Sequence, residues 1–240
     1  MMKLRTYLFI LCMAPLAIFA APPGMPLDKA PIDTKDNASL QRGAETFVNY
    51  CLTCHAASYM RYNRHRDIGL DEPTVLDKLV FTGQKAGDLM LTAMSEKEGE
   101  EWFGVVPPDL SVIARSRGAD WLYTYLRAFY RDSTTVPGWN NLVFDRAAMP
   151  HVLYELQGEQ KLVVNIVDGK EIESLELEKP GKLSVSEYDQ YVADLVNYLV
   201  YLGEPAANDR KRIGMYVLIF LFGFLALSIA LKREYWRDIH

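Results

Sequence analysis

Cysteine, histidine and excess positive charge are all scarce in this chain. Its 240 residues include three cysteines and four histidines. A structural zinc site needs four such ligands close together, and none is expected, because Cys12 lies in an apolar run far from Cys51 and Cys54. Setting aside the eight basic and two acidic residues outside 21–209 leaves 18 basic and 29 acidic residues there, a net charge of −11. Such a surface repels nucleic acid and attracts cationic partners.

The two cysteines of the main body occur in the run Cys51-Leu52-Thr53-Cys54-His55. This is the CxxCH pattern of covalent haem attachment. Two thiols on one helical turn can each add to a vinyl group of one porphyrin, and the next histidine is held under the iron. A thioredoxin-like redox pair also uses CxxC, but it follows a buried strand, whereas the residues before Cys51 have a helical pattern. The run therefore predicts one haem c, with His55 as an axial ligand.

A haem that only carries electrons needs a second axial ligand as well. Met149 precedes Pro150, which lacks a backbone donor and favours an extended conformation at the residue before it. That conformation suits a loop that presents one sulfur atom. We expect Met149 to be this ligand, and His151 is the alternative.

The first apolar segment predicts export. Residues 1–20 begin with two basic residues, continue through an apolar run and end at the small pair Ala20-Ala21. This is the layout of a secretory signal peptide. Ile18 occupies a position where a smaller residue is usual, so an uncleaved anchor stays open. The segment lacks the character of a mitochondrial presequence, which indicates a bacterial envelope protein.

The second apolar segment predicts a membrane span. Ile213–Leu231 contains 19 residues without a charge, which as a helix cover about 28 Å and match the hydrocarbon core. A buried core helix is the alternative, but no polar face interrupts the run. Basic residues flank both ends, so orientation follows from the signal. We predict an exported domain at 21–209, an anchor at 210–231 and a cytoplasmic tail at 232–240.

A helix is predicted from Asn37 or Ser39, as its cap, to about Tyr50. Gly43 lies inside it, although glycine costs a helix roughly 1 kcal/mol relative to alanine. Its presence indicates close approach of another backbone. We expect that backbone to be an amphipathic helix late in the chain.

The late helix has a clear start signal. Ser184 and Glu187 form a capping box before an apolar period of 3.6 that ends near Gly203. Earlier, residues at about 160–180 alternate imperfectly around Asp168-Gly169, which is a tight-turn pair. A peripheral β-hairpin insertion is expected there.

A proline-rich block has two readings. In Pro107–Ser111, followed by Arg115, Arg117 and Trp121, paired prolines can hold a chain against a flat ring, while a guanidinium or indole N–H can bind buried propionates. The same residues fit a turn that begins an amphipathic helix with exposed arginines. The residues alone leave both readings open.

Taken together, these elements resemble the cytochrome c1 family, the haem subunits of ubiquinol–cytochrome c oxidoreductase (the cytochrome bc1 complex). The resemblance covers about residues 37–235. It rests on four groups of residues: Arg42-Gly43 before Cys51–His55, Pro107–Ser111 with Arg115 and Arg117, Met149-Pro150, and Arg233-Glu234-Tyr235-Trp236. It implies a mainly α fold, a c-type cytochrome haem domain with a small β-hairpin insertion and a single C-terminal transmembrane helix.

The resemblance also implies a set of site residues. Two cysteines bind haem covalently, two side chains ligate the iron, and three residues contact the cofactor, of which the arginine and tryptophan reach a propionate: Cys51 and Cys54, His55 and Met149, and Pro108, Arg117 and Trp121. Family members often have a proline where this chain has His151, a departure that concerns the geometry of the loop.

The function implied is a membrane-anchored electron relay without bond chemistry of its own. It would take an electron from a Rieske iron–sulfur protein and pass it to a soluble cationic cytochrome c, beside cytochrome b in a dimeric complex. The haem domain would lie in the periplasm at the bacterial inner membrane. Two rivals remain: an anchored c-type carrier to a terminal oxidase, and a haem enzyme with an open iron face, which carbon monoxide binding would reveal.

Overall fold

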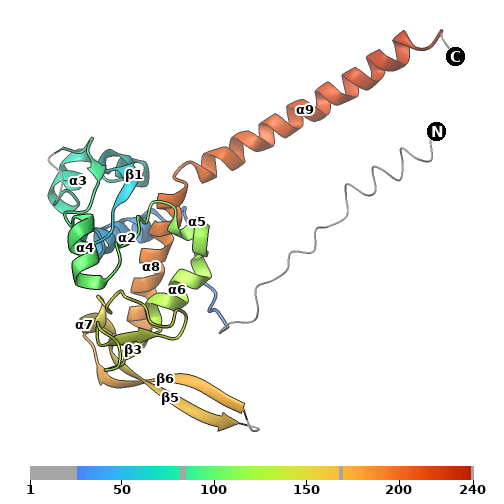
Figure 1. The fold of residues 1–240 in the computed structure, drawn as a ribbon. Helices are drawn as coiled ribbons and strands as arrows, with labels where there is room; N and C mark the ends of the chain where they lie inside the picture. Colours follow the sequence, from blue (N-terminus) through green and yellow to red (C-terminus); the bar gives the residue numbers. More distant parts are fainter. Residues whose placement is uncertain (1–25, 82–84, 168–169, 239–240) are drawn as a thin grey trace.

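The computed structural model describes residues 26–81, 85–167 and 170–238. The predicted signal segment, residues 1–20, lies outside this range. A mainly helical head domain carries a β-hairpin at one end, and a long helix leaves it at the other (Figure 1). The small sheets of the described residues are two-stranded.

Two helices from opposite ends of the chain form the centre of the head domain. Helix α2 spans Asn37–Tyr50 and helix α8 spans Val185–Gly203. The capping box of Ser184 and Glu187 begins α8 as predicted. The cap of α2 was predicted one to three residues too late: the side chain of Asp36 accepts a hydrogen bond from the Ser39 amide at 3.1 Å. Aspartate is among the best N-cap residues because its oxygen satisfies an orphan N–H.

The two helices cross at Gly43, as predicted. A Cβ atom there would lie 2.1 Å from the backbone oxygen of Asp194, so only glycine permits this approach. Beside the crossing, Arg42 binds the buried Asp194 carboxylate through two hydrogen bonds of 2.6 and 3.0 Å. Phe47 and Tyr198 are fully buried around it. Burial of an apolar side chain of this size contributes about 1.5–3 kcal/mol.

Short elements surround this pair, and α6 and α5 pack on α8. In chain order they are β1 Ala57–Arg61, the 3-10 helix η1 Tyr62–Ile68, α3 Glu72–Lys78, β2 Leu89–Met90, α4 Glu96–Phe103, α5 Ile113–Arg117, α6 Ala119–Arg127, β3 Phe129–Arg131, β4 Trp139–Asn141 and α7 Tyr154–Gln157.

The predicted hairpin is present. Strands β5 Gly158–Val167 and β6 Lys170–Pro180 pair antiparallel, with Leu162 opposite Leu175. The hairpin projects from the end of the head domain opposite to α9 (Figure 1). The predicted turn pair, Asp168-Gly169, lies outside the described residues.

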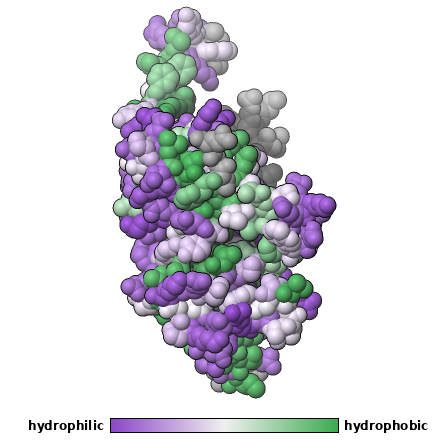
Figure 2. All heavy atoms as spheres, turned by 90° about the vertical axis from the view of Figure 1, so that its left-hand side faces the viewer, coloured by the Kyte–Doolittle hydropathy of each residue, from purple (hydrophilic) through white to green (hydrophobic). Residues whose placement is uncertain are grey.

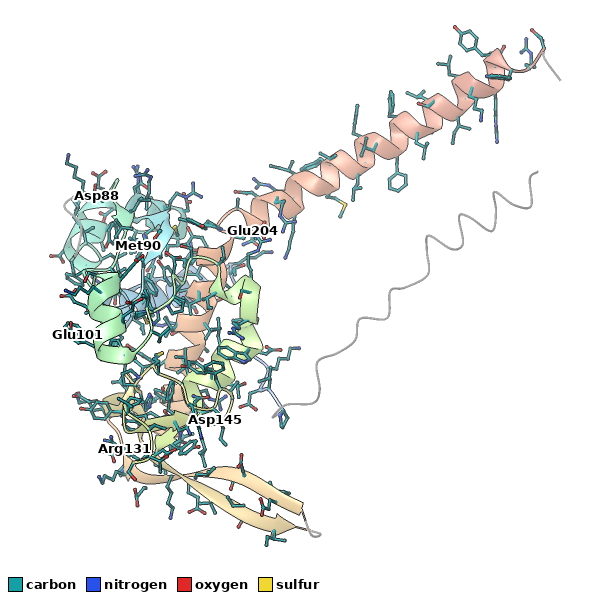
Figure 3. The ribbon with its side chains drawn as sticks, viewed as in Figure 1. Asp88, Met90, Glu101, Arg131, Asp145 and Glu204 are labelled. Atoms are coloured by element: carbon teal, nitrogen blue, oxygen red, sulfur yellow. The ribbon has the colours of Figure 1, made fainter. Side chains whose placement is uncertain are left out.

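Helix α9, Ala207–Tyr235, is the single helix in the described part of the chain that is long and apolar enough to cross a membrane. None of its apolar window is buried. Its side chains point outward along the helix (Figure 3), and in Figure 2 green hydrophobic spheres lie below a purple and white tip. The mainly α architecture with one apolar C-terminal helix is therefore confirmed.

Candidate haem site

The CxxCH residues form a tight turn at the C-terminal end of α2. The Cys51 amide donates to the Phe47 carbonyl at 2.9 Å, and the His55 amide donates to the Cys51 carbonyl at 2.8 Å. Both thiols, on Cys51 and Cys54, are free and half-buried. The helix end thus presents two thiols and an imidazole within a single turn, the set that covalent haem attachment needs.

Burial keeps these thiols protonated. It raises the pKa of Cys51 to about 12, with a smaller contribution from the nearby Cys54, and it raises the pKa of Cys54 as well. The thiolate is the nucleophile and metal-binding form of cysteine. The pair therefore lacks the electropositive setting of a redox-active CxxC, which agrees with a haem attachment role.

A backbone carbonyl sets the tautomer of His55. Its Nδ1 lies 2.7 Å from the Pro108 carbonyl oxygen. Because a carbonyl only accepts, Nδ1 carries the proton and Nε2 keeps its lone pair for a metal. Burial lowers the pKa of His55, although the Pro108 carbonyl and the Asp109 charge oppose this. The imidazole is thus neutral at neutral pH and suited to bind iron.

The proline-rich block is held against the segment that follows the CxxCH turn by backbone and side-chain hydrogen bonds. Four hydrogen bonds of 2.7 to 3.0 Å tie it down: Leu110 N to Ala56 O, Ser58 N to Asp109 Oδ2, Tyr59 N to Ser111 Oγ, and Ser111 N to Asp109 Oδ1. Burial opposes ionisation of Asp109, but the donors on Ser111 and Ser58 outweigh it and lower its pKa. Sequence reasoning missed this strap, whose signal is the Asx-turn pattern of Asp109-Leu110-Ser111.

Met149 is half-buried in the loop before α7. The Tyr125 hydroxyl donates to its sulfur at 3.6 Å, within the longer range that sulfur acceptors need. Tyr125 on α6 was not identified from the sequence. Burial raises its pKa to about 12, so it remains a donor at all physiological pH values.

An aromatic stack connects Met149 to the predicted propionate residues. Trp121 lies on Tyr125 with ring centroids 4.7 Å apart and planes at 10°. The exposed guanidinium of Arg117 lies 5.2 Å from the Trp121 ring and 5.8 Å from that of Phe144. These distances fall within the cation–π range. Arg117 is therefore oriented by the ring that also supports Tyr125.

The predicted residues thus fall into two groups. The first group is the CxxCH turn and its strap, with Cys51, Cys54, His55 and Pro108. The second group consists of Arg117 on α5, Trp121 on α6 and Met149 in the loop before α7. Within the described ranges, no hydrogen bond or ring contact joins the two groups.

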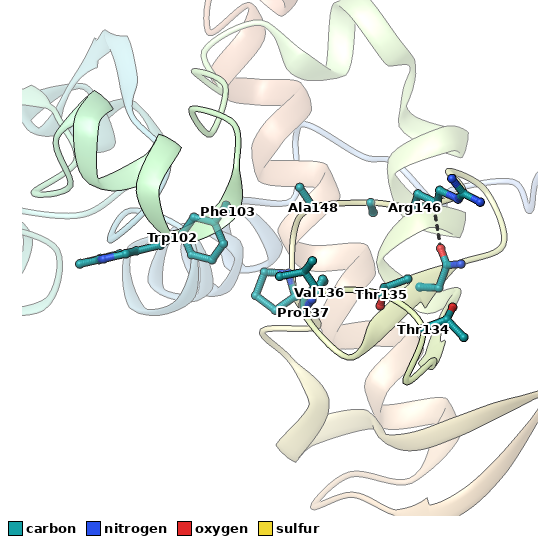
Figure 4. Close-up of a pocket in the computed structure, with 11 residues that line it drawn as sticks. Trp102, Phe103, Thr134, Thr135, Val136, Pro137, Arg146 and Ala148 are labelled. Carbon is teal, nitrogen blue, oxygen red and sulfur yellow. Dashed lines mark hydrogen bonds between the residues drawn. The ribbon is translucent and has the colours of Figure 1, made fainter.

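A cavity of about 620 Å³ lies beside the Met149 loop. Both neighbours of Met149, Ala148 and Pro150, line it. Trp102 and Phe103 at the end of α4 lie across from Ala148 (Figure 4). This volume lies in the range of small-molecule and cofactor sites. None of the predicted haem residues lines this cavity. The fit to a haem c rests instead on the chemistry of the donor set, which is a neutral imidazole, two thiols and a thioether.

His151 has a different setting from Met149. Its ring is 3% exposed, stacks on Phe129 at 5.0 Å and meets the edge of Trp139 at 5.1 Å. Burial lowers its pKa to about 4, although the nearby Gln157 side chain opposes the shift. The histidine is therefore packed as a neutral aromatic residue inside the loop.

Comparison with known proteins adds an independent line of evidence. The model of the cytochrome C1 family matches residues 77–239, more than half of the chain. This chain belongs to the cytochrome c1 family. Cytochrome c1 of Allochromatium vinosum is 47% identical over the full length of both chains. Cytochrome c1 of Rhodospirillum rubrum is 26% identical, covering 85% of this chain and 83% of that protein.

A further relative has a different name. A protein of Nitrosomonas europaea described as an ammonia monooxygenase gamma subunit is 57% identical over the full length of both chains. Membership of the cytochrome c1 family means that the chain is a haem electron-transfer subunit of the cytochrome bc1 complex, is membrane-bound and carries one covalently bound haem c. The c-type cytochrome fold expected from the sequence is confirmed.

Proposed function

We propose that this chain accepts single electrons from a Rieske iron–sulfur protein and passes them to a soluble cationic cytochrome c. Cys51 and Cys54 attach the haem, and His55 and Met149 ligate its iron. The observation that carries the proposal is the hydrogen bond from His55 Nδ1 to the Pro108 carbonyl at 2.7 Å. It leaves Nε2 as the free ligand atom, directly after two free thiols.

The protein residues hold and tune this site. When bound, the haem supplies the one-electron change between ferric and ferrous iron. With His55 and Met149 as ligands, the iron would have no position left for oxygen or substrate. Met149 is a better second ligand than His151, because the imidazole is enclosed by Phe129 and Trp139 while the thioether is held by Tyr125.

Three residues are proposed to contact the cofactor beyond the ligands. Pro108 orients His55 through its carbonyl oxygen, and its own ring would lie against the porphyrin. The Arg117 guanidinium, exposed and oriented by Trp121, is free to pair with a propionate, which matches the preference of guanidinium for carboxylates. The indole N–H of Trp121 is a second donor for the same group.

The charge of the head domain supports a cationic electron acceptor. Residues 21–209 carry a net charge of −11, and helix α4 presents four glutamates: Glu96, Glu98, Glu100 and Glu101. The exposed Trp102 follows them, at the edge of the cavity beside Met149. Because the attraction is electrostatic, the reaction rate with a cationic cytochrome c should fall steeply as salt rises.

The topology proposed is the one predicted from the sequence. The signal peptide at 1–20 directs export, residues 21–209 form the periplasmic head, 210–231 cross the inner membrane once and 232–240 lie in the cytoplasm. Exposed apolar side chains surround α9, which supports packing against cytochrome b and lipid, within a dimeric complex.

Purification in mild detergent tests the assignment of partners. A tagged chain should co-purify with cytochrome b and a Rieske protein, and the preparation should reduce soluble cytochrome c with a quinol as donor. Recovery of monooxygenase subunits in their place, as the name of the Nitrosomonas europaea relative suggests, would contradict the proposal. Recovery of the chain with a terminal oxidase would favour the rival carrier.

Replacing Met149 by leucine tests the axial ligand. The native reduced protein should not bind carbon monoxide, whereas Met149→Leu should bind it and shift its absorbance spectrum, because one iron face is then open. Met94→Leu is the matched control, since Met94 is also half-buried but lies outside the site. Carbon monoxide binding by the native protein would instead favour a haem enzyme.

A further inference from the structure

A second cavity lies at the neck between the head domain and α9. Its volume is about 430 Å³. Glu204, at the bend between α8 and α9 (Figure 3), forms part of its wall. The other walls come from the segment before α2, from Arg115 on α5 and from the first turn of α9: Ile32, Asp33, Thr34, Lys35, Arg115, Val200, Ala207, Asn208, Arg210 and Lys211.

This cavity is basic although the head domain is acidic. Its lining contains four cations against two carboxylates, a local net charge of +2. Arg210 binds Glu204 through two hydrogen bonds of 2.5 and 3.1 Å, and Arg115 reaches the same carboxylate at 3.8 Å. Hydrogen bonding and charge from Arg210, followed by the charges of Arg115 and Lys211, lower the pKa of Glu204.

A single carboxylate cannot neutralise three converging cations. In the described part of the chain, neither Lys211 nor Lys35 forms a salt bridge. Asp33, the other acid of the lining, uses its side chain to accept from the Lys35 backbone amide at 2.9 Å. Positive charge therefore remains available to an anion that enters the cavity.

The cavity lies at the depth of lipid headgroups. The uncharged segment of α9 begins at Ile213, and Arg210 is three residues earlier, about 4.5 Å along the helix axis. The headgroup layer on each side of the hydrocarbon core is roughly 5–8 Å thick. Arg210 and Lys211 therefore lie within it when α9 spans the membrane.

The lining also has an apolar part. Ile32, Val200 and Ala207 contribute to the walls, and the exposed hydrophobic surface of α9 continues from the cavity. A free inorganic anion has no apolar group to bury against such a surface. A phospholipid matches it, because its charged phosphate and its apolar chains are joined in one molecule.

We propose that the neck cavity binds the phosphodiester headgroup of an anionic phospholipid from the leaflet that faces the head domain. Arg115 and Lys211 bind the phosphate, and the acyl chains lie along α9. Because Arg115 belongs to the head and Lys211 to the anchor, one bound lipid restrains the angle between them. This site does not depend on which proteins exchange electrons with the haem.

Lipid retention by the purified complex tests the proposal. The probe is phosphatidylglycerol, added at about 10 mole per cent to phosphatidylcholine nanodiscs that hold the intact complex. After detergent extraction, native mass spectrometry counts the retained lipids. We expect the double variant Arg115→Gln/Lys211→Gln to retain at least five times less phosphatidylglycerol than the wild type.

The control is Lys97→Gln/Lys161→Gln, which removes the same charge from exposed positions on α4 and the hairpin, away from the neck. Equal retention by the neck variant and this control overturns the proposal. Inorganic phosphate that displaces the lipid at a matched concentration also overturns it, because the site is then one for free anions. Lys35→Glu, a single change at an exposed side chain, repeats the test should the double variant fold poorly, and unchanged retention there overturns the proposal too.

Discussion

At the scale of single residues, the proposed site depends on groups that hold the two side chains proposed as iron ligands. His55 is oriented by a backbone carbonyl, and Met149 by a phenolic hydroxyl. Such outer partners decide which atom faces a metal and how strongly it donates. On the proposed ligand assignment, Pro108 and Tyr125 would tune the haem through these two hydrogen bonds.

Replacing Tyr125 by phenylalanine should lower the midpoint potential. The hydroxyl draws electron density from the Met149 sulfur, which weakens its donation and favours ferrous iron. A weak hydrogen bond of about 0.5–1 kcal/mol corresponds to about 20–40 mV for one electron. Potentiometric titration measures the shift. Tyr123→Phe is the control on the same helix, and an equal shift in both variants would contradict this role for Tyr125.

Buried His65 should make stability depend on pH. Its Nδ1 donates to the Tyr62 carbonyl at 2.7 Å, and its Nε2 accepts from the Tyr198 hydroxyl at 2.8 Å. Burial lowers the pKa of His65, although the Tyr62 carbonyl and Asp67 oppose this. The folded state therefore holds the neutral form, and the unfolded chain binds a proton as pH falls through about 6.5.

The contribution of His65 to the free energy of unfolding is therefore at its maximum above about pH 6.5. It falls as the pH drops below that value, by at most about 1.4 kcal/mol per pH unit. For a domain of this size that slope corresponds to at most roughly 3–6 °C per pH unit in melting temperature. Circular dichroism melts between pH 5 and 8 measure it. His65→Gln should melt with a shallower acid slope, and identical slopes would exclude His65 as the cause.

At the scale of elements, the crossing of α2 and α8 positions the CxxCH turn. Gly43 lies two turns before Cys51 on α2, and the strap from Pro108 to Ser111 then holds His55 from the other side. The helix crossing and the strap therefore hold the CxxCH turn from two sides.

Gly43→Ala should destabilise this crossing. The added methyl would lie 2.1 Å from the Asp194 backbone oxygen and 2.6 Å from Tyr198 Cβ, so the helices must separate. We expect a loss of about 3 kcal/mol and a melting temperature roughly 6–12 °C lower. Gly87→Ala is the matched control, since nothing lies within 4 Å of its Cβ position. Similar melting of both variants would refute the close-packing argument.

At the scale of the whole molecule, the head domain and the anchor are nearly independent. The apolar window of α9 has no buried residue, while its first turn touches the head through Asn208, which donates to the Thr34 carbonyl at 3.3 Å. The charged surface of the chain therefore belongs to the acidic head, and the apolar surface suited to a membrane belongs to α9.

Ending the chain after Arg212 should release a folded head. The truncated protein keeps the Asn208 contact and loses only the apolar segment, so we expect it to remain in solution without detergent. Its melting temperature should stay within about 2 °C of the full chain in detergent, because no core contact is removed. Size-exclusion chromatography and thermal melts check this. Aggregation of the truncated head would show that α9 also stabilises the fold.

Much of the proposed site has a sequence signal because covalent haem attachment needs neighbouring residues. Cys51, Cys54 and His55 must share one helical turn, so the signal lies within five positions. The anchor could be predicted for the same reason, because a helix that spans a bilayer needs about 20 consecutive apolar residues. Gly43 signalled a close helix crossing for a similar reason, because glycine is costly inside a helix unless space demands it.

The groups that orient the ligands could be decided only by the tertiary structure. The carbonyl that holds His55 is 53 residues away, and every residue has a carbonyl, so no sequence signal marks the one on Pro108. Tyr125 lies 24 residues from Met149 and resembles the other buried tyrosines of the chain. The enclosure of His151 by aromatic rings likewise follows from folding. The residues that attach the haem are contiguous, so the sequence alone determines them. The groups that orient those residues are distant in the chain, so they depend on which contacts the packed helices form.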